Sequence, residues 1–419
     1  KKLMLFIYRI LINLILFLSP IIFILRILKK KEHPLRFSEK LCFFSKKRNK
    51  GKLIWFHGAS VGEILSVIPL IEKLEKNKKI KQVLITSNTL SSSKIISNLK
   101  LKKTIHQFFP IDTNYHTNKF LKYWNPAVAI FIDSEIWPNT IINIKKKNIP
   151  LVLLNARITK KSFRRWKKFI NIAKTLFQKF DTCISSNLES KKYLYFFGAK
   201  KIKFFGNLKF SQTEMNENSL SKDFKKTISK KKIWCASSTH ESEEILCANV
   251  HKKLKNKYKN LLTVIIPRHV HRTEKITNQI KELNLKVHTH EPKKKIQPNT
   301  DIYLVNSYGN TKSFFKICKT VFLGGSMIKH GGQNPLEAVR FGCNILHGPN
   351  YWNFYEIYNL LNKYEVSFKV KNFKQLSDKV DLMLKKKNNS KNINLKIKKL
   401  GNRILNSTLK EINFFINKK

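Results

Sequence analysis

The chain has 419 residues, 42% of them hydrophobic, and 83 Lys and Arg against 26 Asp and Glu give it a formal net charge of +57. This length suffices for two domains with proper cores, and the hydrophobic share argues against wholesale disorder. The basic excess predicts an anionic partner, namely nucleic acid, a membrane surface or a phosphorylated substrate, although AT-rich coding bias would also enrich Lys. Six scattered cysteines without a C-x-x-C pair favour reduced cytosolic thiols over disulfides or a zinc site.

The N-terminal segment, residues 1–28, is predicted to be a membrane-anchor helix. A bilayer core needs about 20 mostly apolar residues, and residues 10–25 supply an uncharged centre. Three lysines at 29–31 place the bulk of the chain in the cytoplasm by the positive-inside rule. Arg9 leaves open a helix that lies in the membrane interface instead of spanning it. In either case we expect this segment to tether the protein to the cytoplasmic face without taking part in chemistry.

The rest of the chain reads as two similar halves in which short apolar runs alternate with segments of helical period. The alternation predicts βαβ units and parallel sheets, hence an α/β protein with two Rossmann-like domains facing a cleft. Helices are expected at 61–76 and 160–179, for example, and strands begin near 53, 83, 128, 151 and 182, then near 233, 261, 301, 320 and 344. The predicted parts are a basic connector at 29–50, domains at 51–210 and 233–390, a polar linker at 211–232 and a C-terminal helix at 391–419.

Carboxylates stand where strands of the first half meet the helices that follow. The stretch W-F-H-G-A-S-V-G-E ends in Glu63 at the start of a helix, and D-S-E-I-W-P places Asp133 and Glu135 after another strand. A purely structural role is the alternative. Glu63 would then interact favourably with the dipole of the helix that it begins, and Asp133 and Glu135 would mark the start of a helix before Pro138. The small residues before Glu63 exceed what such a role requires. The pattern indicates a general base with a supporting charge.

The second half carries a cation and a glycine-rich loop at corresponding positions. Arg268, in I-I-P-R-H, follows a strand and is suited to binding phosphate. The stretch L-G-G-S-M-I-K-H-G-G-Q-N-P-L-E-A brings backbone N–H groups toward a ligand. Asn334 is expected to be the N-cap of the next helix and Pro335 its first residue. Glu337 would then accept hydrogen bonds from ribose hydroxyls.

Together these motifs resemble the bacterial 3-deoxy-D-manno-octulosonic acid (Kdo) transferases of lipopolysaccharide synthesis. The resemblance runs almost end to end and includes F-G-N-L-K-F, A-S-S-T-H-E-S-E-E and H-G-P-N-Y-W-N-F-Y-E-I. It implies a GT-B glycosyltransferase fold, the donor CMP-Kdo, and the acceptor lipid IV-A, which is a phosphorylated disaccharide lipid. It further implies inverting transfer at the inner membrane, with no metal or other cofactor and no nucleic-acid partner.

The resemblance also implies roles for individual residues. Glu63 corresponds to the catalytic base, and Glu135 and Lys209 to stabilisers of the transition state. A third CMP-binding loop, Gly-Glu-Leu or Gly-Glu-Met in the family, reads Gly309-Asn310-Thr311 here, and Gln333 stands where many members have His. The remaining positions that match CMP-binding motifs are Pro267, Arg268, Asn334, Pro335, Leu336 and Glu337.

Two other functions are compatible with the composition. One is a membrane-associated GT-B glycosyltransferase that uses a UDP-sugar, which a comparison of CMP-Kdo with UDP-sugars as donors would distinguish. The other is a membrane-tethered basic protein that binds RNA. That function predicts aromatic residues interleaved in basic stripes and tolerance to loss of Glu63.

Overall fold

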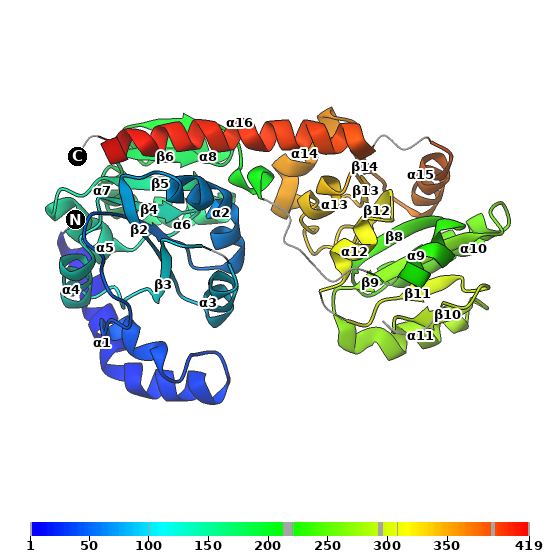
Figure 1. Ribbon diagram of the computed structural model, residues 1–419, viewed down its shortest axis with the longest axis horizontal. Coiled ribbons are helices and arrows are strands. Elements are labelled where there is room, and N and C mark those ends of the chain that lie inside the picture. The colour runs from blue at the N-terminus through cyan, green and yellow to red at the C-terminus, as the bar shows by residue number, and fades with distance from the viewer. Residues whose placement is uncertain are drawn as a thin grey trace. The chain divides into compact units, whose positions relative to one another are not determined.

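The computed structural model describes residues 2–99, 101–212, 220, 222–291, 296–307, 309–386 and 390–417, which belong to two compact α/β units (Figure 1). The first unit is Lys1–Thr213 together with Leu400–Lys419, and the second is Glu214–Lys399. The boundary between them falls within the stretch predicted to be a linker. The last twenty residues of the chain therefore belong to the first unit, although they follow the second in sequence.

The first unit is built on a parallel sheet of seven strands, in the order β3-β2-β1-β4-β5-β6-β7. Its central strands are continuous apolar runs, because helices cover a parallel sheet on both faces. The segment V-A-I-F-I of β4, for example, is buried at all five positions. The strands are β1 (Lys52–His57), β2 (Ile80–Ser87), β3 (Thr104–Phe108), β4 (Val128–Ile132), β5 (Leu151–Ala156), β6 (Thr182–Ser185) and β7 (Ile202–Phe204).

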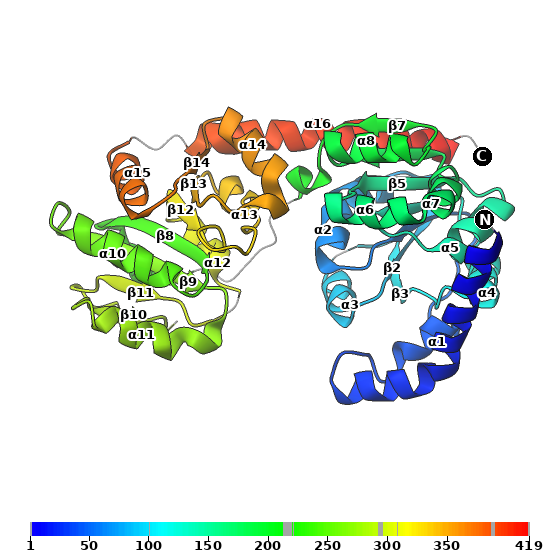
Figure 2. The ribbon, with the colours of Figure 1, turned by 180° about the vertical axis from the view of Figure 1, so that it is seen from behind.

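Helices connect these strands and pack on the sheet, as Figures 1 and 2 show from opposite sides. The helix predicted at 160–179 is two helices, because Phe169 leaves the helical conformation with φ −120° and ψ 42°. Side-chain oxygens of Ser or Thr cap several of the helix starts, as expected where four N–H groups lack helical partners. The helices are α2 (Val61–Glu75), α3 (Leu90–Ser97), α4 (Asn114–Trp124), α5 (Pro138–Lys146), α6 (Lys160–Lys168), α7 (Ile170–Phe177) and α8 (Leu188–Phe196).

The N-terminal helix α1 (Lys2–Leu28) lies against the side of the first unit that carries α4 and α5 (Figures 1 and 2). Its segment Leu3–Leu28 is long and apolar enough to cross a membrane, and only 11% of its most apolar window is buried. The segment predicted to be a basic connector packs on the same unit through the short helix η1 (Arg36–Leu41). There the buried carboxylate of Glu39 accepts hydrogen bonds from Arg36 at 2.7 and 3.0 Å.

The C-terminal helix α16 (Ser390–Asn417) completes the first unit with its last turns. The carboxylate of Glu411 forms ion pairs with Lys201, which precedes the edge strand β7, and with Lys203, which lies within it. Lys52 at the start of β1 donates to the carbonyl of Ile416 at 2.7 Å. These ties explain why the last residues of the chain cluster with its first half.

The second unit repeats the architecture with seven parallel strands in the order β10-β11-β9-β8-β12-β13-β14. Its strands are β8 (Lys232–Thr239), β9 (Leu261–Pro267), β10 (Val287–Thr289), β11 (Ile302–Leu304), β12 (Thr320–Leu323), β13 (Asn344–His347) and β14 (Ser367–Lys369). Its helices are α9 (Lys222–Ser229), α10 (Glu243–Lys255), α11 (Thr273–Lys281), α12 (Thr311–Phe315), α13 (Leu336–Arg340), α14 (Tyr355–Lys363) and α15 (Phe373–Lys385). Three short 3-10 turns are named below: η2 (Leu208–Ser211) belongs to the first unit, and η3 (Val270–Arg272) and η4 (Trp352–Phe354) belong to the second.

Two features differ from the sequence-based expectation. Part of the predicted linker at 211–232 forms α9, in which Phe224 and Ile228, four residues apart, are buried, whereas residues 213–219 lie outside the described part of the chain. The predicted strands also omitted β3, β7, β10 and β14, which stand at the outer edges of the two sheets. Edge strands are covered less completely, so their sequences lack a continuous apolar run. The six cysteines are all buried and free, as expected.

Candidate active site

The first unit places two loops side by side where the direction of chain progression reverses. From β1 the chain proceeds to β2 on one side, whereas β4, the other neighbour of β1, leads to β5 on the opposite side. The loops that leave the carboxyl ends of β1 and β4 therefore diverge and leave room between them. Ligands of open parallel sheets bind at this kind of switch point. Glu63 follows β1 here, and Asp133 and Glu135 follow β4.

Glu63 is half-buried in the first turn of α2 and is held by the loop before it. One carboxylate oxygen accepts from the Ala59 N–H at 2.7 Å, and the other accepts from the Ser60 hydroxyl at 2.8 Å. Ser60 in turn accepts from the Glu63 N–H at 3.4 Å, so the pair forms a capping arrangement. Burial raises the pKa of Glu63, and so does the nearby charge of Glu135, against the opposing effect of these hydrogen bonds. The side chain thus caps the helix and is also a carboxylate of increased basicity.

The two glycines of this loop serve different purposes. A Cβ on Gly58 would lie 3.1 Å from the side chains of Ile132 and Ile64, so this glycine allows the loop to pack closely on its own unit. A Cβ on Gly62 would meet no atom within 4 Å. Gly62 is also exposed and has no positive φ, so neither packing nor backbone conformation requires a glycine there. It leaves the surface beside Glu63 open to an approaching molecule.

The loop after β4 brings two further carboxylates to the same place. Asp133 adopts φ 60°, a left-handed conformation that Asp tolerates better than most residues. Burial raises the pKa of Asp133 to about 6, and Lys209 and Arg157 oppose this rise while Glu63 and Glu135 add to it. Asp133 therefore lies within the electrostatic influence of both glutamates and both cations.

For Glu135 the effects that lower the pKa outweigh the effect of burial, so this carboxylate stays ionised. Its burial alone would raise its pKa, but the close contact with His57 and the hydrogen bond from Trp137 lower the pKa below its ordinary value. The Trp137 indole N–H donates to Oε2 at 2.9 Å, and Nε2 of His57 lies 3.2 Å from the same oxygen. His57 is fully buried at the end of β1 and stacks on Phe109 at 3.8 Å between ring centroids. The structure thus makes His57, at the end of β1, a contact of Glu135.

Lys209 reaches this cluster from the short helix η2. Asn207 caps that helix by accepting from the Lys209 N–H at 2.9 Å, and Asn155, at the end of β5, accepts from the Leu208 N–H at 3.0 Å. Lys209 is the strongest of the nearby charges that lower the pKa of Asp133. The three residues expected to carry the chemistry, Glu63, Glu135 and Lys209, are therefore gathered around Asp133.

The second unit has a switch point of the same kind between β8 and β12. The glycine-rich loop after β12 is organised by Glu243, the first residue of α10, which is 1% exposed. Its carboxylate accepts from the backbone N–H groups of His240 at 3.0 Å, Gly325 at 2.7 Å, Ser326 at 3.1 Å and Met327 at 2.9 Å. Gly324 beside it has no room for a Cβ, which would lie 2.4 Å from the Ser238 carbonyl oxygen.

Glu243 belongs to the motif A-S-S-T-H-E-S-E-E, but the sequence alone predicted no role for this residue. A carboxylate is typical of a helix start, so the sequence held no sign that its partners lie about 80 residues further along the chain. Without Glu243, four buried or half-buried N–H groups of two loops would lose their acceptor. Glu243 is therefore a structural centre of the second switch point.

Cations and imidazoles gather around this loop. Arg268 follows β9 directly and is exposed. Its backbone N–H donates to the Thr239 carbonyl at 2.9 Å. The imidazole of His240 lies 4.2 Å from that of His330, measured between ring centroids, and contacts Gln333 at 3.3 Å. Burial lowers the pKa of His240 to about 4, with the neighbouring histidines and arginines contributing in the same direction, so the ring is neutral at pH 7.

The helix after the glycine pair begins one residue later than expected. Pro335 precedes α13, which starts at Leu336, so Pro335 is not the first helical residue and Asn334 is not the N-cap. The Asn334 side chain still accepts from the Leu336 N–H at 3.2 Å, and Glu337 is exposed in the first turn. In the loop before it, Gly331 and Gly332 both adopt positive φ.

The stretch Gly309-Asn310-Thr311 forms the start of α12, with Gly309 at φ 90°. The Asn310 amide donates to the Ser307 hydroxyl at 2.8 Å and lies 3.4 Å from Nε2 of His290. Asn310 thus stands in a polar loop at the carboxyl end of a neighbouring strand, β11, where the resemblance implied an acidic residue.

Comparisons with known proteins agree with this geometry. The profile of the family described as 3-deoxy-D-manno-octulosonic-acid transferase (kdotransferase) matches residues 35–212. A probable mitochondrial Kdo transferase of Arabidopsis thaliana is 31% identical over 402 residues, which cover 91% of this chain and 89% of that protein. This chain belongs to the Kdo transferase family. A Kdo transferase of Rickettsia felis is 33% identical over 338 residues, covering 80% of this chain and 72% of the relative.

Solved structures support the fold of this Kdo transferase. A putative UDP-N-acetylglucosamine 2-epimerase from Listeria monocytogenes superimposes with a TM-score of 0.60 at 12% identity, over 87% of this chain and 97% of that one. At this identity the likeness concerns the fold alone. Together with the two parallel sheets, it establishes the two-domain GT-B architecture.

The raised pKa of Asp133 predicts a pH-dependent penalty on stability. The folded protein binds this proton more tightly than the unfolded chain, so stability should fall as pH rises from about 4 to about 6. At pH 7 the penalty is roughly 3 kcal/mol, since a tenfold difference in proton affinity is equivalent to about 1.4 kcal/mol. Asp133→Asn, whose side chain also tolerates positive φ, should raise the free energy of unfolding at pH 7 and flatten its pH dependence.

Urea unfolding at pH 4, 5, 6 and 7 measures this effect. Asp378→Asn is the matched control, because the Asp378 side chain is 62% exposed and lies 3.7 Å from its lysine partner. A variant at position 133 whose stability follows the same pH curve as the parent protein would refute the assignment.

The four hydrogen bonds to Glu243 predict that this residue is essential to the second unit. Glu243→Ala should lower the free energy of unfolding by about 3 kcal/mol, because it removes a charged acceptor and leaves buried N–H groups unsatisfied. Glu274→Ala, an exposed glutamate on α11, is the control and should change little. Urea unfolding of both variants provides the measurement, and equal stabilities would contradict the role of Glu243.

Proposed function

We propose that this Kdo transferase moves Kdo from CMP-Kdo onto lipid IV-A with inversion at the sugar carbon and releases CMP. The observation that carries the proposal is the carboxylate cluster at the switch point of the first unit. It joins a carboxylate of raised pKa, Glu63, to one of lowered pKa, Glu135, and to the cation of Lys209. Two carboxylates whose pKa values are moved apart are suited to different roles in one reaction.

Glu63 is proposed as the general base. A hydroxyl of the acceptor attacks the anomeric carbon of Kdo while the bond from that carbon to the phosphate oxygen of CMP breaks. The proton of the hydroxyl passes to Glu63, and the electron pair of the broken bond leaves on the phosphate. A raised pKa favours this step, because burial makes the Glu63 carboxylate a stronger proton acceptor than an exposed one.

Glu135 and Lys209 are proposed to stabilise the charges that develop during transfer. As the bond to CMP breaks, positive charge grows on the sugar ring, which the ionised Glu135 would favour. The hydrogen bond from Trp137 and the contact with His57 fix this carboxylate in place before reaction. Lys209 is suited to the carboxylate of Kdo itself.

Binding of CMP is proposed for the second unit. Arg268 supplies a charge for the phosphate of the leaving group, and the hydrogen bonds to Glu243 hold the glycine-rich loop in a fixed conformation nearby. Asn334 and Glu337 stand at the start of α13 on the same loop. Pro267, Pro335, Leu336 and the stretch Gly309-Asn310-Thr311 complete the proposed set.

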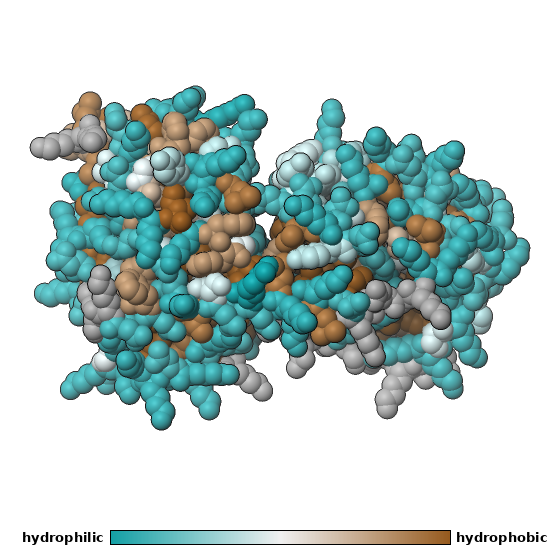
Figure 3. All heavy atoms as spheres, turned by 90° about the horizontal axis from the view of Figure 1, so that it is seen from above, coloured by the Kyte–Doolittle hydropathy of each residue, from teal (hydrophilic) through white to brown (hydrophobic). Residues whose placement is uncertain are grey.

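The acceptor and the membrane are inferred from charge and hydropathy. Six of the nine residues of α6, K-K-S-F-R-R-W-K-K, are basic, which suits the phosphates of lipid IV-A and an anionic membrane surface. Hydrophilic side chains cover most of the face seen in Figure 3, in keeping with the net charge of +57. With α1 as the anchor and lysines at 29–31, we propose that the protein acts at the cytoplasmic face of the inner membrane.

The direct test incubates the purified full chain in detergent with CMP-Kdo and lipid IV-A and determines the mass of the product. Addition of one or more Kdo units supports the proposal and also counts them. Parallel reactions with UDP-sugars address the remaining glycosyltransferase alternative. Transfer from a UDP-sugar without transfer from CMP-Kdo would overturn the assignment of the donor.

Replacing Glu63 with Gln should lower turnover by about 10²- to 10⁴-fold, the range that general-base catalysis supplies. CMP affinity should barely change, because the proposed CMP contacts belong to the second unit. Glu72→Gln, at an exposed position of the same helix, is the control. Single-turnover transfer measured beside a CMP titration separates the outcomes, and near-normal transfer would reduce Glu63 to a helix cap.

Replacing Arg268 with Ala should weaken CMP binding by roughly 10- to 150-fold, the equivalent of a charge-assisted hydrogen bond of about 1.5–3 kcal/mol. Lys281→Ala removes an exposed cation of α11 in the same unit and should leave the affinity unchanged. Calorimetric titration with CMP measures both. Equal affinities of the two variants would exclude Arg268 as the phosphate contact.

A further inference from the structure

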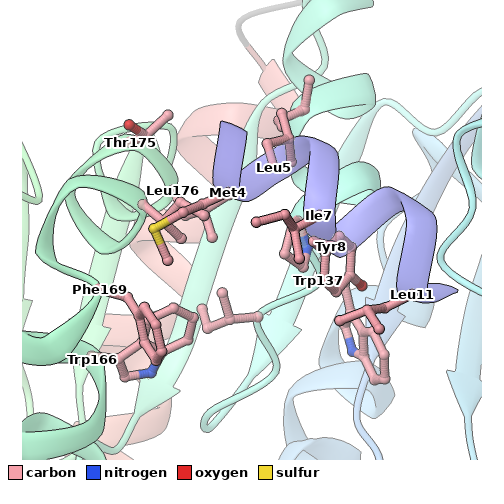
Figure 4. Close-up of a pocket in the computed structure, with 14 residues that line it drawn as sticks. Met4, Leu5, Ile7, Tyr8, Leu11, Trp137, Trp166, Phe169, Thr175 and Leu176 are labelled. Carbon is pink, nitrogen blue, oxygen red and sulfur yellow. The ribbon is translucent and has the colours of Figure 1, made fainter. Parts of the chain in front are cut away.

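A cavity of about 600 Å³ lies within the first unit between α1, the start of α5 and the α6–α7 segment (Figure 4). Figure 4 shows side chains of α1 on one side of it and aromatic and aliphatic side chains of α6 and α7 across from them. Its walls are almost wholly hydrocarbon, with hydroxyls only on Tyr8 and Thr175. The principal lining residues are Met4, Ile7, Leu11, Trp166, Phe169 and Leu176.

The wall that α1 provides is fixed to the unit by polar contacts. The Tyr8 hydroxyl donates to Asp112 at 2.7 Å, and Nε of Arg9 donates to the Asn139 side chain at 3.0 Å. Asp112 is 1% exposed and also accepts from the N–H groups of Asn139 at 3.0 Å and Thr140 at 2.8 Å, at the start of α5. Buried charged groups with several partners are restrictive in geometry. The N-terminal third of α1 is therefore held in register with α5, and the cavity is a built feature of the unit.

The same helix continues beyond the cavity as an uncovered apolar surface. Leu14 and Leu18 continue the helical face of Leu11, and they are 53% and 41% exposed, values that suit hydrocarbon surroundings more than water. A hydrocarbon chain that lies along this helix in a bilayer can follow it into the cavity without crossing water. The occupant that this continuity favours is an acyl chain of a membrane lipid.

A second cavity, of about 360 Å³, adjoins the first and is lined by both apolar and charged side chains. The two share Ile136, Trp166 and Phe169 as lining residues. The second is also lined by the reactive-site carboxylate Asp133 and by Arg157 and Arg165. An apolar cavity next to one with two guanidinium groups matches an amphiphile with an anionic sugar head and an acyl tail.

We infer that the cavity between α1, α5 and α7 binds one acyl chain of the acceptor, so that α1 forms part of the acceptor site. This inference rests on the proposed function, because the neighbouring carboxylates are those assigned to transfer. It implies that the protein distinguishes acylated from deacylated acceptors through contacts of its own and not only through partition into the membrane.

The test compares two acceptors with the same head, a tetra-acylated diphosphoryl disaccharide and its fully deacylated form. Ile7→Trp on α1 and Ile172→Trp on α7 each place an indole in the cavity. The KM for the acylated acceptor should rise at least about tenfold, since each displaced methylene contributes about fourfold to affinity. The kcat/KM for the deacylated acceptor should stay within about twofold, because its head does not reach the apolar walls.

Ile10→Trp is the matched control for Ile7→Trp. The two isoleucines stand one turn apart on α1, and Ile10 is 52% exposed and Ile7 46%, but only Ile7 lines the cavity. Equal losses with both acceptors, or equal effects of Ile7→Trp and Ile10→Trp, would overturn the inference. The first result would indicate a general disturbance of the unit, and the second an effect of the membrane helix.

Photo-crosslinking gives a second measurement that does not require turnover. An acylated acceptor with a diazirine at the end of one chain should label cavity residues, with Met4 and Leu176 as the expected sites. Ile172→Trp should abolish that labelling. Labelling confined to the outer face of α1, at Phe17 or Ile21, would overturn the inference. A protein that labels in the cavity but transfers no Kdo would retain the acyl-chain site and refute the proposed function alone.

Discussion

The arrangement of the molecule depends on the reversal of strand order within each parallel sheet. A right-handed crossover from β1 to β2 and another from β4 to β5 carry their helices away from each other, so the loops between them cannot fill the same space. Each unit thus has one position at which two strand ends meet without a covering helix. Glu63 and Asp133 occupy that position in the first unit, and Glu243 with the glycine-rich loop occupies it in the second.

The two switch points use acidic residues in different ways. In the second unit the Glu243 carboxylate is satisfied by four backbone N–H groups, so its charge serves the loop and is not available to a ligand. In the first unit the charge of Glu135 raises the pKa of Glu63, and the charges of both glutamates raise the pKa of Asp133. Unresolved repulsion of this kind costs stability and is characteristic of sites whose charges act on a substrate. Glu243 is thus a structural acid, whereas the carboxylates of the first unit are those that we propose to act on a substrate.

The sequence predicted the alternating fold and the gathering of Glu63, Asp133 and Glu135, because the carboxyl ends of parallel strands share one edge of a sheet. It did not predict the partners of Glu243, which come from a loop far along the chain, nor His57 as a contact of Glu135. Both depend on which strands become neighbours, and strand order is not encoded in hydrophobic period. Helix α9 was missed within a polar stretch, although Phe224 and Ile228 stand at helical spacing. The apolar face of this helix consists of only these two residues, and the charged residues around them hide its helical period.

The N-terminal helix α1 combines residues that contact the first unit with residues that form an exposed apolar surface. Its length and hydropathy describe a membrane segment, and they say nothing about Tyr8 and Arg9, which would be poor choices for the middle of a bilayer. Both residues find partners in the first unit, where Asp112 and Asn139 accept their hydrogen bonds. The two polar residues therefore mark the part of α1 that is fixed to the first unit, whereas the mostly apolar stretch beyond them is largely exposed. A helix divided in this way is suited both to anchoring in a membrane and to forming one wall of the apolar cavity.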